Sequence, residues 1–461
     1  MKGNKKGLPI SHMGHIGVHC HIFIVLVLLA MLFMASWSPV QASVPRITEI
    51  KQGATASMAV DENGKLWCWG SNFDGECGIE PVSGNKSTYY IVTPTRVKGI
   101  SNVIGMDEGT HWFVVALDKN HNVWTWGDNS YRTLGRDVKA DPPYTVPEMV
   151  PRLVRVKTVT TGDDFCTVLL ENGTVWSWGR NEGAQLGDGT VYTYPVDDSM
   201  NRSDPGMVIN LSDIKDISSG NRNVIAITND GEPWIWGFGS VYLMGDYGKT
   251  HYSALMAYSR VSTPVHLENL HDIDSVAVGL YFAVALKEDG TVWTWGSNYC
   301  GQLGTGKLDD SYDPVPVQGL SDIIQVSAGT EHALALSKDG TVWSWGRSQY
   351  GQVGDGTTTD RDSPVKLDLP KIVSISAKGD NSMALDVDGN VWTWGSNNFG
   401  ELGNGEYVMD GYRTVPEKVT FPDFADEDPG TAPDNSTGVT GSSPTPMPTS
   451  TVTPTLTPEP T

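Results

Sequence analysis

The chain has 461 residues, including 16 Trp, 51 Gly and 27 Pro, and its 54 acidic and 32 basic side chains leave a formal net charge of -22. A surface of that charge would repel phosphates, so we expect no nucleic-acid partner. Hydrophobic residues make up 39% of the chain and charged residues 19%, which is enough to form a large core and excludes global disorder.

The N-terminus carries the features of an export signal. Lys2, Lys5 and Lys6 precede an uncharged apolar run over residues 22–35, which is short for a membrane span. Val40 and Ala42 then form a small-residue cleavage site, so we predict a signal peptide over residues 1–42, with an uncleaved membrane anchor as the alternative. Either would place the body outside the cell or in the cell envelope. Cleavage would remove three lysines and no acid, taking the net charge from -22 to -25.

Tryptophan recurs in a periodic motif. Fourteen of the 16 Trp fall in seven copies of Trp-x-Trp-Gly, whose first residues lie 49 to 59 positions apart. A unit of that length repeated seven times is typical of a solenoid or a propeller. The paired tryptophans are Trp67, Trp69, Trp124, Trp126, Trp176, Trp178, Trp234, Trp236, Trp293, Trp295, Trp343, Trp345, Trp392 and Trp394.

Residue patterning within each copy predicts strands. The two Trp lie at i and i+2 and therefore face the same side of a pleated strand. An apolar strand such as 332–336 precedes this strand, joined to it by Asn-Gly or Asp-Gly, which favour tight hairpins; only the second copy differs, with Asn120-His121. A further strand precedes the hairpin, as at 323–327, and a fourth follows a proline, as at 364–367.

Four antiparallel strands in each of seven units describe an all-β fold, a seven-bladed β-propeller over residues 47–421. We expect the paired tryptophans to pack between blades as structural core and the protein to be a monomer. Residues 430–461 are almost entirely Thr, Pro, Ser and Gly, a composition that predicts a disordered linker or stalk.

Cysteine is sparse after the predicted signal. Cys68 and Cys77 could form a disulfide within the first repeat or remain free, and Cys166, in the middle of a predicted strand, is expected to be a free buried thiol. No spacing resembles a zinc site, and the acidic connectors match no calcium-loop motif. We therefore expect no metal and no cofactor.

The string from Asp339 to Gly346, together with the element Gly301-Gln302-Leu303-Gly304, closely resembles the regulator of chromosome condensation repeat. Related forms of the second element lie at 184–187, 351–354 and 400–403, but none follows Trp236-Gly237 in the fourth copy. The resemblance covers all seven units and implies a seven-bladed propeller. The family includes a nuclear exchange factor for a small GTPase, a plant ultraviolet-B receptor and secreted inhibitors of β-lactamase, so it implies no single function.

The connectors that follow the Gly-Gln-Leu-Gly elements vary in length and are rich in tyrosine, which offers a large contact area at a low entropy cost. We predict that they bind a protein partner; a carbohydrate- or cell-wall-binding module and guanine-nucleotide exchange by family analogy are the alternatives. The rings could also simply pack their own loops. No nucleophile, phosphate-binding or paired metal-ligand motif is present, so an enzyme is not expected. The candidate binding residues are Tyr89, Tyr90, Trp112, Tyr192, Tyr194, Tyr242, Tyr247, Tyr252 and Tyr258.

The N-terminal prediction can be tested by intact mass spectrometry of the protein expressed in its source organism. We expect the purified chain to begin at Ser43 and to be recovered from the medium or the envelope fraction. A mass that includes residues 1–42, found in the membrane fraction, would instead establish the uncleaved anchor.

Overall fold

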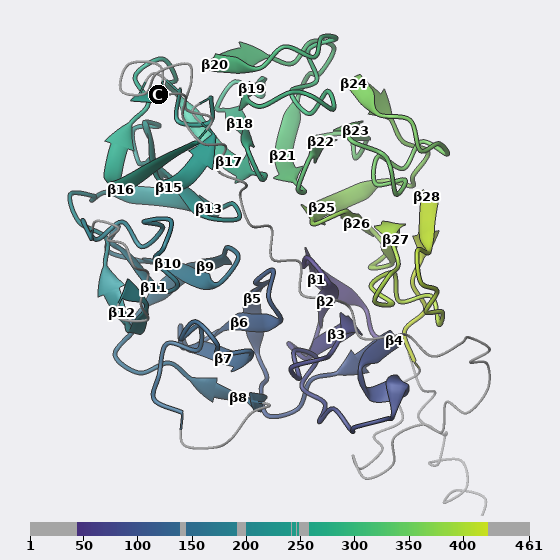
Figure 1. The fold of residues 1–461 in the computed structure, drawn as a ribbon. Helices are drawn as coiled ribbons and strands as arrows, with labels where there is room; N and C mark the ends of the chain where they lie inside the picture. The colour runs from purple at the N-terminus through teal and green to yellow at the C-terminus, as the bar shows by residue number, and fades with distance from the viewer. Residues whose placement is uncertain are drawn as a thin grey trace, which may run out of the picture. The chain divides into compact units, whose positions relative to one another are not determined.

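The computed structural model describes residues 44–138, 144–190, 200–240, 242–245, 247–248 and 258–422. The predicted signal over 1–42 and the linker over 430–461 lie outside these described residues. The strands form seven separate sheets, each made of four consecutive antiparallel strands, so the all-β seven-bladed propeller is confirmed. Figure 1 shows the blades following one another from the purple first blade to the yellow-green last blade beside it.

The first strand of each blade faces the centre of the ring. Neighbouring inner strands contact one another, and β1 contacts β25 of the last blade as well as β5 of the second, so the ring is closed. Side chains reinforce this: the Ser376 hydroxyl accepts a hydrogen bond from the main chain of Gln52 at 2.9 Å. The inner strands are β1 (Ile47–Gln52), β5 (Val103–Glu108), β9 (Val156–Thr161), β13 (Ile214–Ser219), β17 (Ile273–Val278), β21 (Ile323–Ala328) and β25 (Ile372–Lys378).

The second and third strands form the predicted tight hairpins. Gly64 of the first turn has a φ of +69°, and in the second blade His121 adopts the same left-handed conformation at +64°, so the exceptional Asn120-His121 still makes this turn. The second strands are β2 (Ala56–Asp61), β6 (Phe113–Asp118), β10 (Phe165–Leu170), β14 (Asn223–Thr228), β18 (Phe282–Lys287), β22 (His332–Ser337) and β26 (Asn381–Asp386). The third strands are β3 (Leu66–Ser71), β7 (Val123–Gly127), β11 (Val175–Gly179), β15 (Pro233–Ser240), β19 (Val292–Gly296), β23 (Val342–Gly346) and β27 (Val391–Ser396).

The fourth strand is the outer edge of each blade and begins earlier than the sequence predicts. Every outer strand starts three to six residues before its proline rather than after it. An edge strand tolerates proline because one side of its backbone needs no partner, and proline discourages pairing with another chain. The outer strands are β4 (Tyr90–Arg96), β8 (Tyr144–Met149), β12 (Arg202–Met207), β16 (Tyr258–His266), β20 (Ser311–Pro316), β24 (Arg361–Lys366) and β28 (Tyr412–Lys418).

The second tryptophan of each pair joins one blade to the preceding blade. Its ring is at most 1% exposed, and its indole N–H donates to a main-chain carbonyl in the preceding connector. The bond from Trp69 to Glu401 joins the first blade to the last, and the six equivalent bonds each join a blade to the one before it. The donor and acceptor residues are Trp69 and Glu401 (2.9 Å), Trp126 and Glu76 (2.8 Å), Trp178 and Thr133 (2.7 Å), Trp236 and Gln185 (2.9 Å), Trp295 and Leu243 (3.0 Å), Trp345 and Gln302 (2.9 Å), and Trp394 and Gln352 (2.9 Å).

The first tryptophan of each pair has a different environment. Only Trp67, at 5% exposure, is buried, and the other six are half-buried. Their indoles bond within their own hairpin where a bond is present, as from Trp124 to Asp118 at 3.0 Å and from Trp293 to Thr291 at 3.1 Å. The first ring of most pairs therefore packs only partly against the core between blades, whereas the second ring is enclosed in it.

The fourth blade contains a connector element whose sequence does not match the Gly-Gln-Leu-Gly motif. Tyr242-Leu243-Met244-Gly245 takes the place of Gly-Gln-Leu-Gly: the Leu243 carbonyl accepts the Trp295 indole bond, and Leu243 and Met244 are fully buried. Gly245 has a φ of +56°, like Gly304 at +64° in the fifth blade. The expectation that this element is missing is therefore wrong, because the position requires a carbonyl, apolar side chains and a final glycine rather than a glutamine.

The blade interface can be tested with Trp345→Phe, which keeps a ring but removes the donor to Gln302. We expect the free energy of unfolding to fall by about 2 to 4 kcal/mol, because a buried carbonyl loses its partner and a void remains. Trp343→Phe, on the same strand but half-buried, should cost less than about 1 kcal/mol. Urea unfolding followed by far-UV circular dichroism measures both, and equal losses would contradict this division of roles.

Candidate functional site

The connectors between third and fourth strands share one face of the ring with the loops between first and second strands. In every blade, the residue after Trp-x-Trp-Gly donates its main-chain N–H to the residue before the second strand, as from Asp128 to Trp112 at 2.9 Å and from Arg180 to Asp164 at 2.8 Å. The hairpin turns lie at the other end of these strands. We call the surface formed by these connectors and loops the connector face.

Six aromatic rings from three adjacent blades meet on the connector face. Phe73 is their centre: its ring stacks on Tyr89 at a centroid distance of 5.5 Å and lies 5.9 Å from Trp112. It also contacts Tyr90 at 5.2 Å and Phe399 at 6.4 Å, and Tyr90 stacks on Tyr407 at 4.0 Å. All six side chains are half-buried. We call this group, which spans blades seven, one and two, the aromatic cluster; its members are Phe73, Tyr89, Tyr90, Trp112, Phe399 and Tyr407.

Trp112 is held in a strained conformation. Its φ is +54°, although the other six residues at this position before the second strand do not have positive φ. Its indole N–H is buried and has no hydrogen-bond partner among the described residues. A bulky residue in this region of backbone space costs free energy and is typical of positions where function constrains the chain.

The structure brings only some of the predicted binding residues together. Tyr89, Tyr90 and Trp112 join the aromatic cluster, whereas Tyr242 pairs with Tyr312 at 4.4 Å and Tyr247 packs on the core between blades four and five. Tyr258 opens β16. The remaining candidates, Tyr192, Tyr194 and Tyr252, lie outside the described residues.

The binding residues predicted from the sequence omitted Phe73, Phe399 and Tyr407. Phe73 and Phe399 each lie shortly before a Gly-Glu pair that occupies the place of Gly-Gln in its connector. An aromatic residue recurring in this segment of blades one and seven was the available signal. The predicted residues in the connectors were all tyrosines, so neither phenylalanine was among them.

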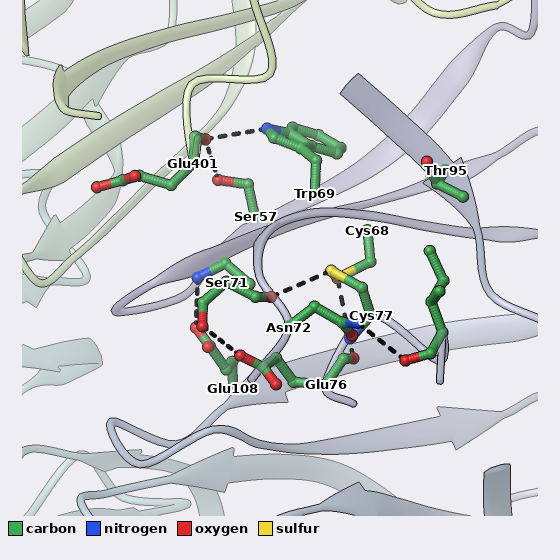
Figure 2. Close-up of a disulfide and its surroundings, with 12 residues drawn as sticks. Ser57, Cys68, Trp69, Ser71, Asn72, Glu76, Cys77, Thr95, Glu108 and Glu401 are labelled. Carbon is green, nitrogen blue, oxygen red and sulfur yellow. Dashed lines mark hydrogen bonds between the residues drawn. A yellow bond between two sulfur atoms is a disulfide. The ribbon is translucent and has the colours of Figure 1, made fainter. Parts of the chain in front are cut away.

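A disulfide in blade one joins strand β3 to the connector that carries Phe73. Cys68 and Cys77 are both fully buried and are bonded to each other, with 5.2 Å between their Cα atoms (Figure 2). Four other blades have a serine or threonine at the position of Cys68 and a leucine at the position of Cys77. There the hydroxyl donates a hydrogen bond to the leucine carbonyl, as from Thr125 to Leu134 at 2.7 Å. In blade one a covalent bond thus takes the place of a hydrogen bond. Cys166 is buried and free.

Buried carboxyl groups lie in the same region. Glu76 accepts hydrogen bonds from the main chain of Asp74 at 3.0 Å and from the Ser71 hydroxyl, and Glu108 accepts one from the main chain of Ala56 at 3.1 Å. Burial raises the pKa of Glu76 to about 8 and that of Glu108 to about 7, and their proximity adds to the rise at Glu76. Figure 2 shows both glutamates close to the disulfide. Blades three, five and six have Gln at the position of Glu76.

Paired charges cover the connector face of blades three, four and six. Asp164, which is fully buried, lies 2.9 Å from Arg180 and 2.8 Å from His111. The hydrogen bond that His111 donates to the Asp164 carboxylate raises the pKa of His111. Further pairs join Arg222 to Asp163 at 3.2 Å and Arg347 to Glu331. These groups neutralise one another within the fold.

The inner strands enclose a polar cavity of about 370 Å³ at the centre of the ring. Lys378 of blade seven reaches across to blade two, where its Nζ lies 3.0 Å from Asp107, and to blade three, where it donates to the Thr161 hydroxyl at 3.0 Å. Burial alone would raise the pKa of Asp107, but Lys378 and Lys51 lower it overall. The ion pair therefore links blades that do not adjoin.

Over the described ranges, no three His, Cys, Asp or Glu side chains converge in a way that could hold a metal ion. The same part of the chain contains no helix with the length and apolarity needed to cross a membrane.

Comparison with known families identifies the repeats. A model of the RCC1-like domain matches residues 109–432, and a model of the regulator of chromosome condensation (RCC1) repeat matches residues 47–76. The chain belongs to the regulator of chromosome condensation repeat family. The confirmed membership agrees with the repeat motif and with the seven blades.

Curated relatives are similar over part of their length. RCC1 domain-containing protein RUG3, mitochondrial, of Arabidopsis thaliana is 28% identical over 52% of this chain and 53% of its own. Ultraviolet-B receptor UVR8 of the same plant is 28% identical over 58% and 57%, and guanine nucleotide exchange factor SRM1 of Saccharomyces cerevisiae is 26% identical over 58% and 56%. The chain thus spans about half the length of the curated relatives it matches.

Solved structures share the fold. The yeast RCC1 (Prp20) structure with bound Kap60 aligns with a TM-score of 0.67 and 22% identity over 84% of this chain and 86% of the other. Human WBSCR16 aligns with a TM-score of 0.63 and 21% identity over 74% and 87%. Identities this low establish the architecture alone.

The raised pKa values of the buried Glu76 and Glu108 predict how the stability of the fold depends on pH. Because the pKa of Glu76 and that of Glu108 are higher in the fold than in an unfolded chain, their contribution to stability is complete below about pH 4.5 and is lost as the pH rises through about 7 to 8. Between its pKa in the unfolded chain and its pKa in the fold, each of these groups lowers the free energy of unfolding by up to about 1.4 kcal/mol per unit rise in pH.

Glu76→Gln introduces the residue that blades three, five and six have at this position. At pH values above 8 it should therefore raise the midpoint temperature of thermal unfolding, and at pH 5 it should change that temperature little. Glu62→Gln, at an exposed turn, is the matched control and should leave the profile unchanged. A Glu76→Gln profile parallel to that of the unmodified protein would refute the assignment.

Proposed function

We propose that this protein is an exported, non-enzymatic binding scaffold that recognises a protein partner through its connector face, at the aromatic cluster. The observation that carries the proposal is the meeting of six half-buried rings from three blades around Phe73. Partly exposed aromatic rings on a rigid support offer contact area with little loss of conformational entropy, and such residues dominate protein interfaces.

Export is supported by the signal-like N-terminus and by the disulfide. A structural disulfide persists in oxidising compartments and is rare where thiols are kept reduced. In blade one it takes the place of a hydrogen bond that other blades make without cysteine, so this blade is suited to an oxidising environment. We therefore assign the protein to the extracellular space or the cell envelope.

Protein binding also accords with the relatives. One solved relative is yeast RCC1 (Prp20) with Kap60 bound. Exposed aromatic rings also stack on sugars, which keeps a carbohydrate or cell-wall ligand as the second candidate. Exchange of guanine nucleotides is an alternative by analogy with SRM1.

The test is capture by the immobilised full chain from envelope and medium extracts of the source organism, with bound proteins quantified by mass spectrometry. Phe73→Ala and Trp112→Ala should each reduce capture of the same protein at least about tenfold, as expected for central interface rings. Tyr299→Ala is the matched control, because Tyr299 is 56% exposed in the fifth-blade connector, outside the aromatic cluster. It should leave capture unchanged.

Circular dichroism would verify that the variants are folded. Unaltered capture by both cluster variants would refute the site. Retention of the chain on insoluble cell wall or polysaccharide, lost with the same two variants and without a captured protein, would establish the carbohydrate alternative.

A further inference from the structure

Two aspartates adjoin the aromatic cluster. Asp74 directly follows Phe73, and Asp128 donates its main-chain N–H to the carbonyl of Trp112 at 2.9 Å. Both side chains are half-buried. The backbone of each aspartate therefore adjoins that of one of the two rings that connect blades one and two.

These carboxylates lack the counter-charge that the rest of the face provides. The Asp128 carboxylate accepts hydrogen bonds from the main chain and hydroxyl of Ser130, and neither aspartate has an ion-pair partner among the described residues. Burial raises the pKa of Asp74, and repulsion from Asp128 raises it further. The two carboxylates thus lie near enough to repel each other, and no cation among the described residues pairs with either.

The equivalent positions of other blades indicate what is missing. In blades three and six, the residue after Trp-x-Trp-Gly is an arginine that pairs with an acid before the second strand: Arg180 with Asp164, and Arg347 with Glu331. Blade two has the same main-chain bond but reverses the chemistry, since Asp128 occupies the arginine position and Trp112 the acidic one. The arginine is thus replaced by an acid and the acid by an aromatic ring, so this pair contains no base.

An arginine supplied from outside would complete this arrangement. A guanidinium forms paired hydrogen bonds with carboxylates and stacks on aromatic faces, and it is more weakly hydrated than an ammonium group. The strained backbone of Trp112 holds its ring 5.9 Å from that of Phe73. The net charge of -22 would also speed the approach of a basic segment.

We propose that the aromatic cluster docks a basic segment of the partner by seating an arginine side chain against Trp112 and Phe73, with Asp74 and Asp128 as its counter-charges. This inference rests on the proposed function and names the chemistry of its partner. It assigns the cation to an arginine rather than a lysine because the matching internal pairs of blades three and six use arginine.

The test measures fluorescence anisotropy of the full chain with three labelled peptides of equal length, in which glycine alternates with arginine, lysine or glutamate. We expect the arginine peptide to bind most tightly and more weakly as salt rises. Asp74→Asn/Asp128→Asn should weaken its binding at least about tenfold. The matched control is Asp309→Asn/Asp322→Asn, which removes the same charge from exposed sites elsewhere and should weaken binding less than about twofold.

Each other outcome overturns part of the proposal. Equal losses in the two double variants would show attraction to the acidic surface in general, and equal affinity for the lysine peptide would refute the assignment to arginine. If the captured partner is lost with Trp112→Ala but kept by Asp74→Asn/Asp128→Asn, protein binding stands and the basic segment is wrong. If neither set of variants alters capture, the proposed function itself fails.

Discussion

The ring depends on one repeated interaction, the hydrogen bond from a buried indole to a main-chain carbonyl of the preceding blade. A propeller sheet buries its faces only against its neighbours, so stability requires each interface to be filled and polar groups there to be paired. Tryptophan does both, because its ring fills the space and its N–H satisfies the carbonyl. Since Trp69 bonds to Glu401 as each later blade bonds to its predecessor, the ring closes without exchanging a strand.

This regularity makes the exceptions informative. Blade one replaces a hydroxyl bond with the Cys68–Cys77 disulfide and a glutamine with Glu76, and the loop of blade two is strained at Trp112. These departures lie in the connector that carries Phe73 and in the loop that carries Trp112, whereas blades three and six keep internally neutralised pairs on the same face. A scaffold whose interfaces are equivalent can vary its connectors without losing the fold.

Much of the architecture could be predicted from local patterns. Trp-x-Trp-Gly spacing and the Asp-Gly and Asn-Gly dipeptides correctly indicated hairpins, and seven copies indicated seven blades. The outer strands were placed too late because proline was treated as their start, although an edge strand can contain it. The fourth connector element was missed because only the carbonyl of Leu243 and the turn at Gly245 are required there, and neither depends on a glutamine.

The sequence by itself determined the repeat, the strand alternation and the family, because each of these depends on residues close together in the chain. Only the tertiary structure decided which aromatic rings meet, since Phe73, Trp112 and Phe399 belong to different blades, and the closure of the ring brings the last blade beside the first. It also decided how deeply each paired tryptophan is buried. Two side chains on the same strand face can differ in burial because the neighbouring blade covers one of them more completely than the other.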